Sequence, residues 1–308
     1  MIGKNLGADP VRSCFICLYM RSGLNPPISH SADSPQIIVR ETVCKTILNK
    51  SSISDYSLNC YTGCAHGCVY CYARFMQRFH PHDEPWGKFV DVKINAVEVL
   101  KRQLRRAKPG DVFISSACDG WQPIEKQCRL TRRCCELLLE FGFKVNLLTK
   151  SALVLHDLDI FSGRDVNVGV SIATLDERLS KLWEPRAAIA EERLQVIEAA
   201  RKAGLKTTIM FAPLLPFLSD GRSSLKAMFQ RAADLKVDSI LVDALNPRPR
   251  VWPSVAGLLR DHFPELRERY SRILFNPKIR AEYLAQFRSE VAIAAERLSL
   301  TDRVTECF

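Results

Sequence analysis

Residues 59–72 are the most distinctive part of this chain and read NCYTGCAHGCVYCY. Within them, Cys64, Cys68 and Cys71 form the spacing CxxxCxxC, with no further cysteine at ferredoxin-like spacing. Three thiolates on one loop can hold three corners of a cubane iron–sulfur cluster, whereas the clusters of electron carriers are normally held by four cysteines. One iron would then keep an open coordination position, where chemistry can take place. The loop therefore predicts a catalytic metal centre.

The residues beside the three cysteines also suit a metal-binding loop. Gly63 and Gly67 flank ligands at points where the backbone must bend tightly and approach the cluster. Tyr70 comes directly before the last cysteine and could stack on a planar ligand of the open iron. From spacing alone, zinc with Cys60 or His66 as a remote fourth ligand stays open as an alternative.

At these residues the chain resembles the radical S-adenosylmethionine (SAM) enzymes, whose signature is CxxxCxxC with an aromatic residue before the third cysteine. The longer string YTGCAHGCVYCYARF is similar to the spore photoproduct lyase-like branch, often called DNA-repair photolyases. The resemblance runs from about Val39 to about Pro247. It implies an enzyme in which Cys64, Cys68 and Cys71 hold a [4Fe–4S] cluster and SAM is the second cofactor.

Composition sets broad limits on the class of protein. The chain has 308 residues, of which 47% are hydrophobic, enough for one large domain or a domain with an appendage. Many of the 12 cysteines crowd into one loop, which favours metal over disulfides and a reducing, cytoplasmic location. No apolar run is long enough to span a membrane, so we expect no membrane partner.

The net charge of +10 favours a polyanionic partner such as nucleic acid. Solvated helix faces account for the same charges equally well. The basic clusters are Lys101, Arg102, Arg105, Arg106 and Lys108, followed by Lys126, Arg129, Arg132 and Arg133.

The order of the expected elements predicts the fold. Residues 1–38 read as a loose N-terminal extension, in which Cys14 and Cys17 form a CxxC of undetermined role. Over residues 39–247, strand-like and helix-like runs alternate, as in repeated βα units with parallel strands. We expect strands at about Ser57–Cys60, Asp111–Ser115, Lys144–Thr149, Val166–Ile172, Lys206–Phe211 and Ser239–Val242. We expect helices at about Ala96–Arg106, Thr131–Phe141, Glu191–Ala203 and Ser223–Leu235, with Gly142 and Gly204 as C-caps.

Together these units predict an α/β fold, and the resemblance implies a partial (β/α)6 TIM-like barrel whose cluster loop spans residues 60–72. Residues 248–308 are expected to form a C-terminal helical extension that caps the barrel. Its helices are predicted at about Ser254–His262, Pro264–Arg272 and Ile279–Leu298, and the ending Thr301–Phe308 is expected to fray.

The active site of a parallel barrel gathers at the carboxyl ends of its strands. Ser115 follows the second strand and could bind the amino or ribose groups of SAM. The resemblance implies that Lys150 and Ser171 contact SAM, with Lys150 binding the carboxylate group of SAM. It also implies that Tyr70 contacts the adenine and that Tyr72 lies close to the reaction.

Cys118 is a second candidate catalytic residue. In the lyase that gives the branch its name, a cysteine after this strand donates a hydrogen atom to the product radical. Cys118 lies in SACDGWQP, within a residue or two of that place, although a small core residue is an equal alternative. We expect Cys128, Cys134 and Cys135 to be buried apolar residues.

Three histidines carry weaker signals. His66 lies between two of the cysteines and could donate a hydrogen bond to a cluster sulfur or cap the loop. His80 and His82 form an HxH pair, for which we favour a structural role over metal binding.

The leading hypothesis is reductive cleavage of SAM, followed by hydrogen abstraction from a substrate. A photolesion in DNA is the suggested substrate, with a peptide, an RNA or a small molecule as the alternative. An external one-electron reductant of the flavodoxin or ferredoxin type would be a partner. A non-enzymatic iron–sulfur or zinc module is the competing hypothesis, and it predicts four protein ligands and no SAM turnover.

Overall fold

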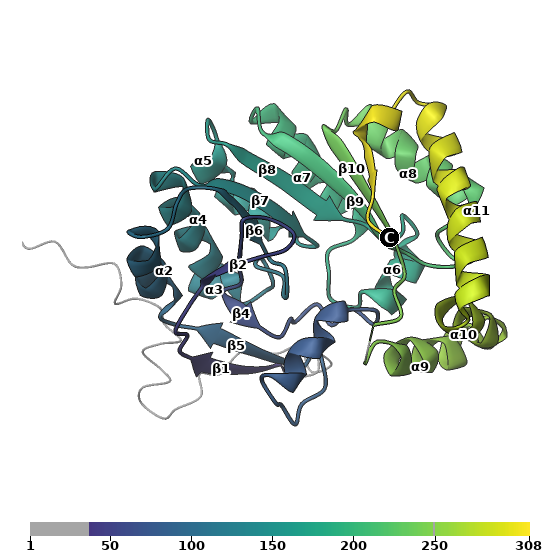
Figure 1. The fold of residues 1–308 in the computed structure, drawn as a ribbon, viewed down its shortest axis with the longest axis horizontal. Helices are drawn as coiled ribbons and strands as arrows, with labels where there is room; N and C mark the ends of the chain where they lie inside the picture. Colours follow the sequence, from purple (N-terminus) through teal and green to yellow (C-terminus); the bar gives the residue numbers. More distant parts are fainter. Residues whose placement is uncertain (1–36, 249) are drawn as a thin grey trace, which may run out of the picture.

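The computed structural model describes residues 37–248 and 250–308 (Figure 1). Cys14, Cys17 and nearly all of the expected N-terminal extension lie outside these residues.

An eight-stranded sheet forms the body of the molecule, with the strand order β11-β10-β9-β8-β7-β6-β3-β2. Its inner strands all pair in parallel and coincide with those expected from the sequence. They are β3 (Tyr56–Leu58), β6 (Asp111–Ile114), β7 (Lys144–Thr149), β8 (Val166–Ser171), β9 (Lys206–Leu214) and β10 (Ser239–Ala244). The α/β class and the mostly parallel sheet with C-terminal helices are therefore confirmed.

The two edges of the sheet carry strands that the sequence analysis did not predict. At one edge, β2 (Leu48–Lys50) pairs antiparallel with β3. At the other, β11 (Val304–Glu306) pairs in parallel with β10, and the Cys307 amide donates to the Val242 carbonyl at 2.9 Å. The expectation that residues 301–308 fray was wrong, because the exposed edge of β10 offers backbone partners that a short β-branched segment can satisfy.

Helices cover the outer face of the sheet (Figure 1). The long ones agree with the expected positions to within two residues: α2 (Ala96–Leu104), α4 (Leu130–Glu140), α7 (Ala190–Lys202) and α8 (Arg222–Asp234). Short helices also occur in the crossovers: α3 (Glu125–Cys128) before α4, α6 (Glu177–Trp183) before α7, and the 3₁₀ segment η3 (Ala152–Asp157) with α5 (Leu158–Phe161) between β7 and β8. Gly142 and Gly204 end α4 and α7 with φ values of 77° and 74°, as expected for C-caps.

A second, three-stranded sheet supports the cluster loop. Its order is β1 (Ile38–Thr42), β5 (Phe89–Lys93) and β4 (Tyr61–Thr62), and the loop runs from β4 to the 3₁₀ helix η2 (Tyr72–Arg78). The sequence analysis did not predict this sheet, because its pairings join segments far apart in the chain.

The C-terminal region packs against the cluster loop as well as against the body of the molecule. It comprises α9 (Trp252–His262), η4 (Pro264–Leu266), α10 (Arg267–Phe275), α11 (Pro277–Glu296) and η5 (Thr301–Arg303). A separate apolar cluster joins Cys68 and Tyr70 of the loop to Trp183 and to Leu259 and Tyr270 of these helices. Among the described residues, no helix combines the length and apolar character needed to cross a bilayer.

Candidate functional site

The cluster loop has a backbone that two glycines make possible. Gly63 and Gly67 have φ values of +82° and +64°. A Cβ atom at Gly63 would lie 2.5 Å from the Phe89 carbonyl oxygen, and one at Gly67 would lie 2.4 Å from Nη2 of Arg186. Both positions therefore require glycine for conformation and for space.

Two side chains hold this loop from opposite sides. Gln122 is fully buried, accepts a hydrogen bond from the Ala65 amide at 2.8 Å and donates to the Gly63 carbonyl at 3.3 Å. Arg186 donates through Nε to the Ala65 carbonyl and through Nη2 to the Gly87 carbonyl, each at 2.5 Å. Sequence reasoning missed both residues, because neither lies near the cysteines in the chain.

The three cysteines lie in a shielded environment that contains hydrogen-bond donors for sulfur. Cys64 and Cys68 are buried and Cys71 is half-buried. Burial raises the pKa of all three thiols. A backbone hydrogen bond from Asp119 opposes this rise in the pKa of Cys64, and a backbone bond at Ala73 does the same for Cys71. Such thiols need a bound cation to become thiolates, which is what metal ligation provides.

Trp86 adds an observation that fits a cluster at this loop. Its side chain is 6% exposed, and its indole Nε1 has no hydrogen-bond partner among the described residues. The interaction of this indole with Cys71 lowers the pKa of that thiol against the effect of burial. Hydrogen bonds to ligand sulfurs are one of the ways in which proteins set cluster potentials.

A site for a single metal ion is absent from the described part of the chain, where no three His, Cys, Asp or Glu side chains converge. A cubane cluster places its cysteine ligands on separate irons, so convergence on one point is not required. The buried thiols, the sulfur-directed donors and the nearby cations of Arg74 and Arg186 fit a [4Fe–4S] cluster at Cys64, Cys68 and Cys71.

A buried ionic network lies beside the loop. Glu184 and Arg193 are each 1% exposed at the side chain and form an ion pair, and the Tyr70 hydroxyl donates to the same carboxylate. Lys150 Nζ lies 3.4 Å from Glu184 Oε1 and 5.8 Å from the centroid of the Tyr70 ring. Burial alone would raise the pKa of Glu184, but Arg193, Lys150 and the Tyr70 hydroxyl outweigh it and lower this pKa to about 2.

The network has a net positive charge and one accessible cation. Arg193 balances the charge of Glu184, so that the charge of Lys150 is in excess, and the Lys150 side chain is 16% exposed. Tyr70 is held at its hydroxyl and packs face to face with Trp183 at a centroid distance of 6.2 Å. Sequence reasoning found Lys150 and Tyr70 but missed Glu184 and Arg193, whose role depends on a contact between α6 and α7.

The loop after β6 is fixed by Asp119. Its Oδ1 accepts from the Thr149 hydroxyl at 2.8 Å, and its Oδ2 accepts from the Lys150 amide at 2.7 Å. His66 Nδ1 lies 3.4 Å from Oδ2, and burial lowers the pKa of His66 although Asp119 opposes the change. This carboxylate therefore joins the cluster loop to the end of β7 and has few lone pairs left for a ligand.

The two predicted serines differ in availability. Ser115 has a φ of 76°, and its hydroxyl accepts from the Gly120 amide at 2.7 Å, so that it closes the loop after β6. Ser171 lies at the end of β8, where its carbonyl accepts from Arg193 Nη1 at 2.7 Å. The hydroxyl of Ser171 has no partner among the described residues, which leaves it available to a ligand.

Cys118 and Tyr72, the predicted catalytic residues, are brought together by Asn59. The Tyr72 hydroxyl donates to the Ser116 carbonyl, and Asn59 Nδ2 donates to the Ser116 hydroxyl at 2.8 Å. Cys118 Sγ lies 3.7 Å from Asn59 Oδ1, and burial raises the pKa of this thiol to about 12. Tyr72 is 51% exposed. A buried thiol and an exposed phenol ring are therefore connected in space through Ser116 and Asn59.

The inner face of the sheet carries uncharged polar side chains together with apolar ones and Asp111. A cavity of about 330 Å³ is lined in part by Asn146, Asn167, Thr208 and Ser239. Thr208 donates to Asn167 Oδ1 at 3.0 Å and shares a 2.7 Å hydrogen bond with Ser239. The alternation of polar and apolar residues in KVNLLT and VNVGVS could have predicted these polar inward-facing side chains, but the strand assignment did not use it.

Other expectations have mixed outcomes. Cys134 and Cys135 are buried as expected, and Cys128 is half-buried. His82 is held by Glu84 and by Asp91, whose Oδ2 lies 2.9 Å from Nε2, in agreement with a structural role.

Comparison with known proteins agrees with this geometry. The model of the Radical SAM superfamily matches residues 58–229. An uncharacterized protein of Mycobacterium tuberculosis is 32% identical over 291 residues, which cover 87% of this chain and 85% of the relative. An uncharacterized protein of Methanocaldococcus jannaschii is 34% identical over 168 residues, which cover 54% of this chain and 63% of the relative.

Solved structures share the fold over nearly the whole chain. A spore photoproduct lyase complexed with dinucleoside spore photoproduct is similar with a TM-score of 0.66 and 13% identity, over 96% of this chain and 94% of that chain. A mutant lyase with bound AdoMet and the same dinucleoside gives 0.67 and 13% over the same shares. The cysteine loop, the parallel sheet and the family match together place this chain in the radical SAM superfamily.

Proposed function

We propose that this chain cleaves SAM reductively and uses the resulting radical to begin lyase-type repair of a pyrimidine photolesion in DNA. The observation that carries the proposal is the three-cysteine loop within a fold shared with spore photoproduct lyase over 96% of the chain. The net charge of +10 is compatible with a DNA substrate.

Three cysteines supply the ligands for the cofactor. Cys64, Cys68 and Cys71 would hold a [4Fe–4S] cluster and leave one iron open to SAM. When bound, cluster and SAM together would supply one-electron cleavage of the sulfonium C5′–S bond of SAM. A reductant of the flavodoxin or ferredoxin type would provide the electron.

The ionic network would position SAM. The accessible ammonium of Lys150 carries charge in excess of its partners and can receive the carboxylate of SAM as a point charge. Ser171 offers an unpartnered hydroxyl. Tyr70 cannot rotate freely, because Glu184 holds its hydroxyl and Trp183 packs on its ring, so its position is set before SAM binds.

Cys118 is suited to return a hydrogen atom to a carbon radical. Its pKa of about 12 keeps the thiol protonated at neutral pH, and only the S–H form can donate a hydrogen atom. In that step the hydrogen atom passes from sulfur to carbon, and the unpaired electron passes from carbon to sulfur. Tyr72 lies close by and is 51% exposed, so that its ring can contact a base turned out of the DNA stack.

The test is 5′-deoxyadenosine formation from SAM by anaerobically reconstituted protein with dithionite, in the absence and presence of UV-irradiated DNA. We expect production that the Cys68→Ala variant abolishes and that Cys307→Ala, which removes an exposed cysteine, retains. Full turnover by Cys68→Ala would exclude the assignment. Turnover without conversion of thymine photoproducts in the DNA would refute the substrate and leave the SAM chemistry in place.

A further inference from the structure

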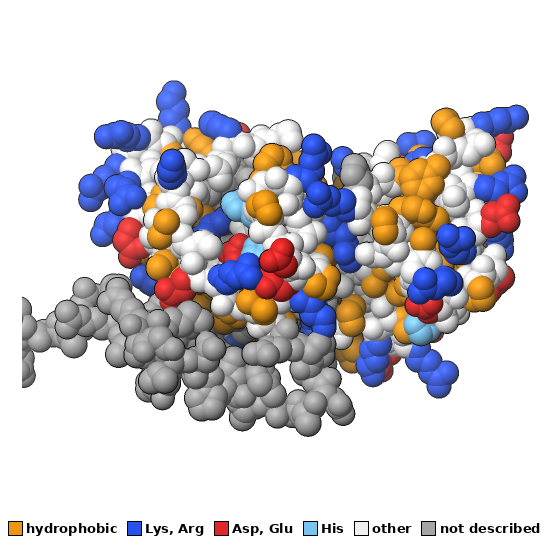
Figure 2. All heavy atoms as spheres, turned by 90° about the horizontal axis from the view of Figure 1, so that it is seen from below, with side chains coloured by type: hydrophobic (Ala, Val, Ile, Leu, Met, Phe, Trp, Pro, Cys, Tyr) orange, Lys and Arg blue, Asp and Glu red, His pale blue; other side chains and the backbone are white. Residues whose placement is uncertain are grey.

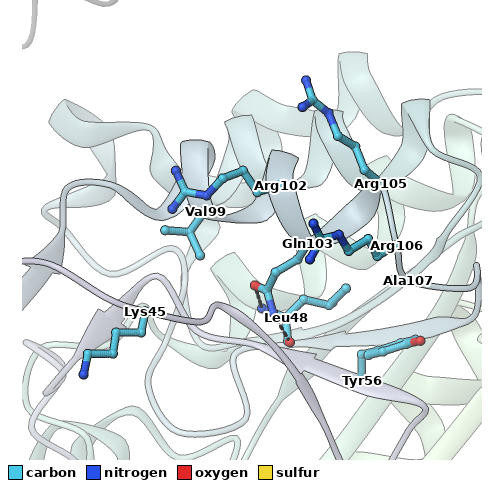
Figure 3. Close-up of a pocket in the computed structure, with 9 residues that line it drawn as sticks. All are labelled: Lys45, Leu48, Tyr56, Val99, Arg102, Gln103, Arg105, Arg106 and Ala107. Carbon is cyan, nitrogen blue, oxygen red and sulfur yellow. Dashed lines mark hydrogen bonds between the residues drawn. The ribbon is translucent and has the colours of Figure 1, made fainter.

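A large basic pocket lies on the outside of the barrel, apart from the cluster loop. It has a volume of about 610 Å³ and lies between α2 and the β2–β3 edge of the sheet (Figure 3). Its floor contains Leu48, Tyr56 and Val99, which are buried. We call it the α2 groove.

The rim of the α2 groove consists of cations. Arg102 lies in the last turn of α2, Arg105 and Arg106 follow directly after the helix, and Lys45 lies across from them. None of the described residues that line the groove is an aspartate or a glutamate. Figure 2 shows many Lys and Arg side chains at the end of the molecule that carries α2.

These four cations have no ion-pair partner among the described residues. Some exposed cations on other helices are instead paired with glutamates: Lys181 with Glu177, Lys202 with Glu198, Arg222 with Glu290 and Arg231 with Glu191. The carboxyl end of α2 attracts cations through its dipole, but that effect is confined to the last turn and does not reach across to Lys45.

The groove is already formed in the chain alone. Gln103 Oε1 accepts from the Ile47 and Leu48 amides at 2.9 and 3.0 Å, and its Nε2 donates to the Leu48 carbonyl at 2.9 Å (Figure 3). These bonds tie α2 to β2 and fix the spacing of the two walls. Binding there would need little reorganisation of the backbone.

The directions of the cations favour an extended polyanion over a single anion. In Figure 3 the guanidinium groups of Arg102 and Arg105 and the ammonium of Lys45 point in different directions. Cations that chelate one phosphate converge on it, whereas cations spread along a groove can meet successive phosphates of a strand. We propose that the α2 groove binds the sugar–phosphate backbone of a nucleic acid.

Such a site would hold the nucleic acid without touching the reacting atoms. Tyr56 begins β3 in the groove, whereas the cluster loop follows the other end of that strand, and catalytic loops gather at the carboxyl ends of parallel strands. The inference rests on the proposed function only for the choice of nucleic acid as the polyanion. The α2 groove would add a contact to phosphates that depends on charge and not on the base sequence of the nucleic acid.

The test is fluorescence anisotropy of the full chain with a fluorescein-labelled, undamaged DNA duplex of about 20 base pairs, between about 50 and 200 mM salt. The groove variant combines Arg102→Gln, Arg105→Gln and Arg106→Gln. The matched control combines Arg267→Gln, Arg272→Gln and Lys278→Gln, which removes three exposed charges from α10 and α11. A second groove variant, Lys45→Gln, changes the opposite wall and leaves α2 intact.

We expect the triple groove variant to bind at least about tenfold more weakly and to lower the slope of log affinity against log salt by about 2–3, while the control stays within about twofold of wild type. Lys45→Gln should lower the slope by about 1. Equal losses in the groove variant and the control, or none in either groove variant, would overturn the proposal. Displacement of the duplex by polyglutamate or inorganic phosphate at equal charge would also overturn it, in favour of an acidic protein or a single anion.

Formation of 5′-deoxyadenosine without DNA keeps this inference separate from the proposed function. We expect it to be unchanged in both groove variants. If wild-type protein fails to cleave SAM yet shows the groove-dependent binding, the proposed function fails and the nucleic-acid site stands.

Discussion

At the residue scale, the site depends on buried polar side chains whose partners come from distant parts of the chain. Glu184 is the clearest case, because a carboxylate that is 1% exposed is stable there only with Arg193, Lys150 and Tyr70 around it. Trp86 is another, since its buried indole N–H has no hydrogen-bond partner among the described residues and the indole lowers the pKa of Cys71. These contacts make single substitutions informative.

Glu184→Gln should destabilise the fold and weaken SAM binding. It leaves the buried Arg193 without a counter-charge, which costs about 3–5 kcal/mol. We expect this loss in the free energy of unfolding at pH 7, measured with urea, together with a raised Kd for SAM. Glu177→Gln, which breaks an exposed pair with Lys181, is the control and should change stability by less than about 1 kcal/mol. Equal stability of the two variants would contradict the argument.

Glu125 should make the free energy of unfolding fall as the pH rises, which is opposite to the effect of most carboxylates. Burial is the main cause that raises its pKa from 4.5 to about 7, although the hydrogen bond from Tyr61 opposes the rise. The folded state holds the proton more tightly than the unfolded chain, so the contribution to stability is complete below pH 4.5 and is lost as the pH rises to 7. Between pH 4.5 and 7, the free energy of unfolding of the wild type should fall by up to about 3 kcal/mol relative to that of Glu125→Gln. Parallel pH profiles of unfolding for the two proteins would disprove this account.

Trp86→Phe should shift the potential of the reconstituted cluster to a more negative value and leave the fold intact. The substitution keeps the ring in its place between the loop and β5 but removes the donor to the Cys71 sulfur, and such donors favour the reduced cluster. Redox titration followed by electron paramagnetic resonance measures the change. An unchanged potential would show that the indole does not reach the sulfur in the loaded protein.

At the scale of elements, short loops between strands do most of the positioning. The cluster loop is fixed by two glycines, by Gln122 from the loop after β6 and by Arg186 from the segment after α6. The loop after β6 is in turn fixed to the end of β7 through Asp119. A change in backbone shape at one of these points should therefore affect cofactor assembly more than overall stability.

Gly67→Ala should reduce the iron and sulfide that the protein retains, because the added Cβ would lie 2.4 Å from Arg186 Nη2 on a backbone with φ +64°. Gly163→Ala is the matched control, since that residue has a φ of +71° with nothing within 4 Å of the added atom. Both variants carry the strain of a positive φ, of order 1–2 kcal/mol. We expect only Gly67→Ala to lose cluster content in iron and sulfide assays, and equal contents would refute the steric argument.

At the scale of the whole molecule, the sheet is an open structure whose edges need protection. β2 covers one edge and β11 covers the other, and β11 comes from the end of the chain after α11. An uncovered edge exposes unpaired backbone groups that invite pairing with another chain. The last residues therefore contribute to the integrity of the barrel.

Deletion of residues 301–308 should lower the midpoint of thermal unfolding and promote aggregation, because β10 loses its partner. Glu306→Gln removes only the ion pair with Arg288 and serves as the control. Thermal unfolding with simultaneous light scattering distinguishes the two. A truncated protein that matches the control in both measurements would show that β11 is dispensable.

The sequence by itself determined most of the elements and the candidate ligands of the cluster. Periodicity marked the parallel strands and the long helices to within a few residues, since a helix or strand reports its own period locally. The cysteine spacing marked the cofactor loop because three ligands to one cluster must lie close along the chain. The family resemblance carried by that loop also pointed to Tyr70 and Tyr72 within it and to Lys150 and Cys118 after later strands.

Only the tertiary structure decided the contacts that are local in space but remote in the chain. The β1-β5-β4 sheet, the pairing of β11 with β10, and the partners Gln122, Glu184 and Arg193 all join segments separated along the sequence. The α2 groove arises in the same way, because one of its walls comes from α2 and the other from β2. Burial and electrostatic pairing depend on contacts between remote segments, and such contacts leave no periodic pattern in the sequence.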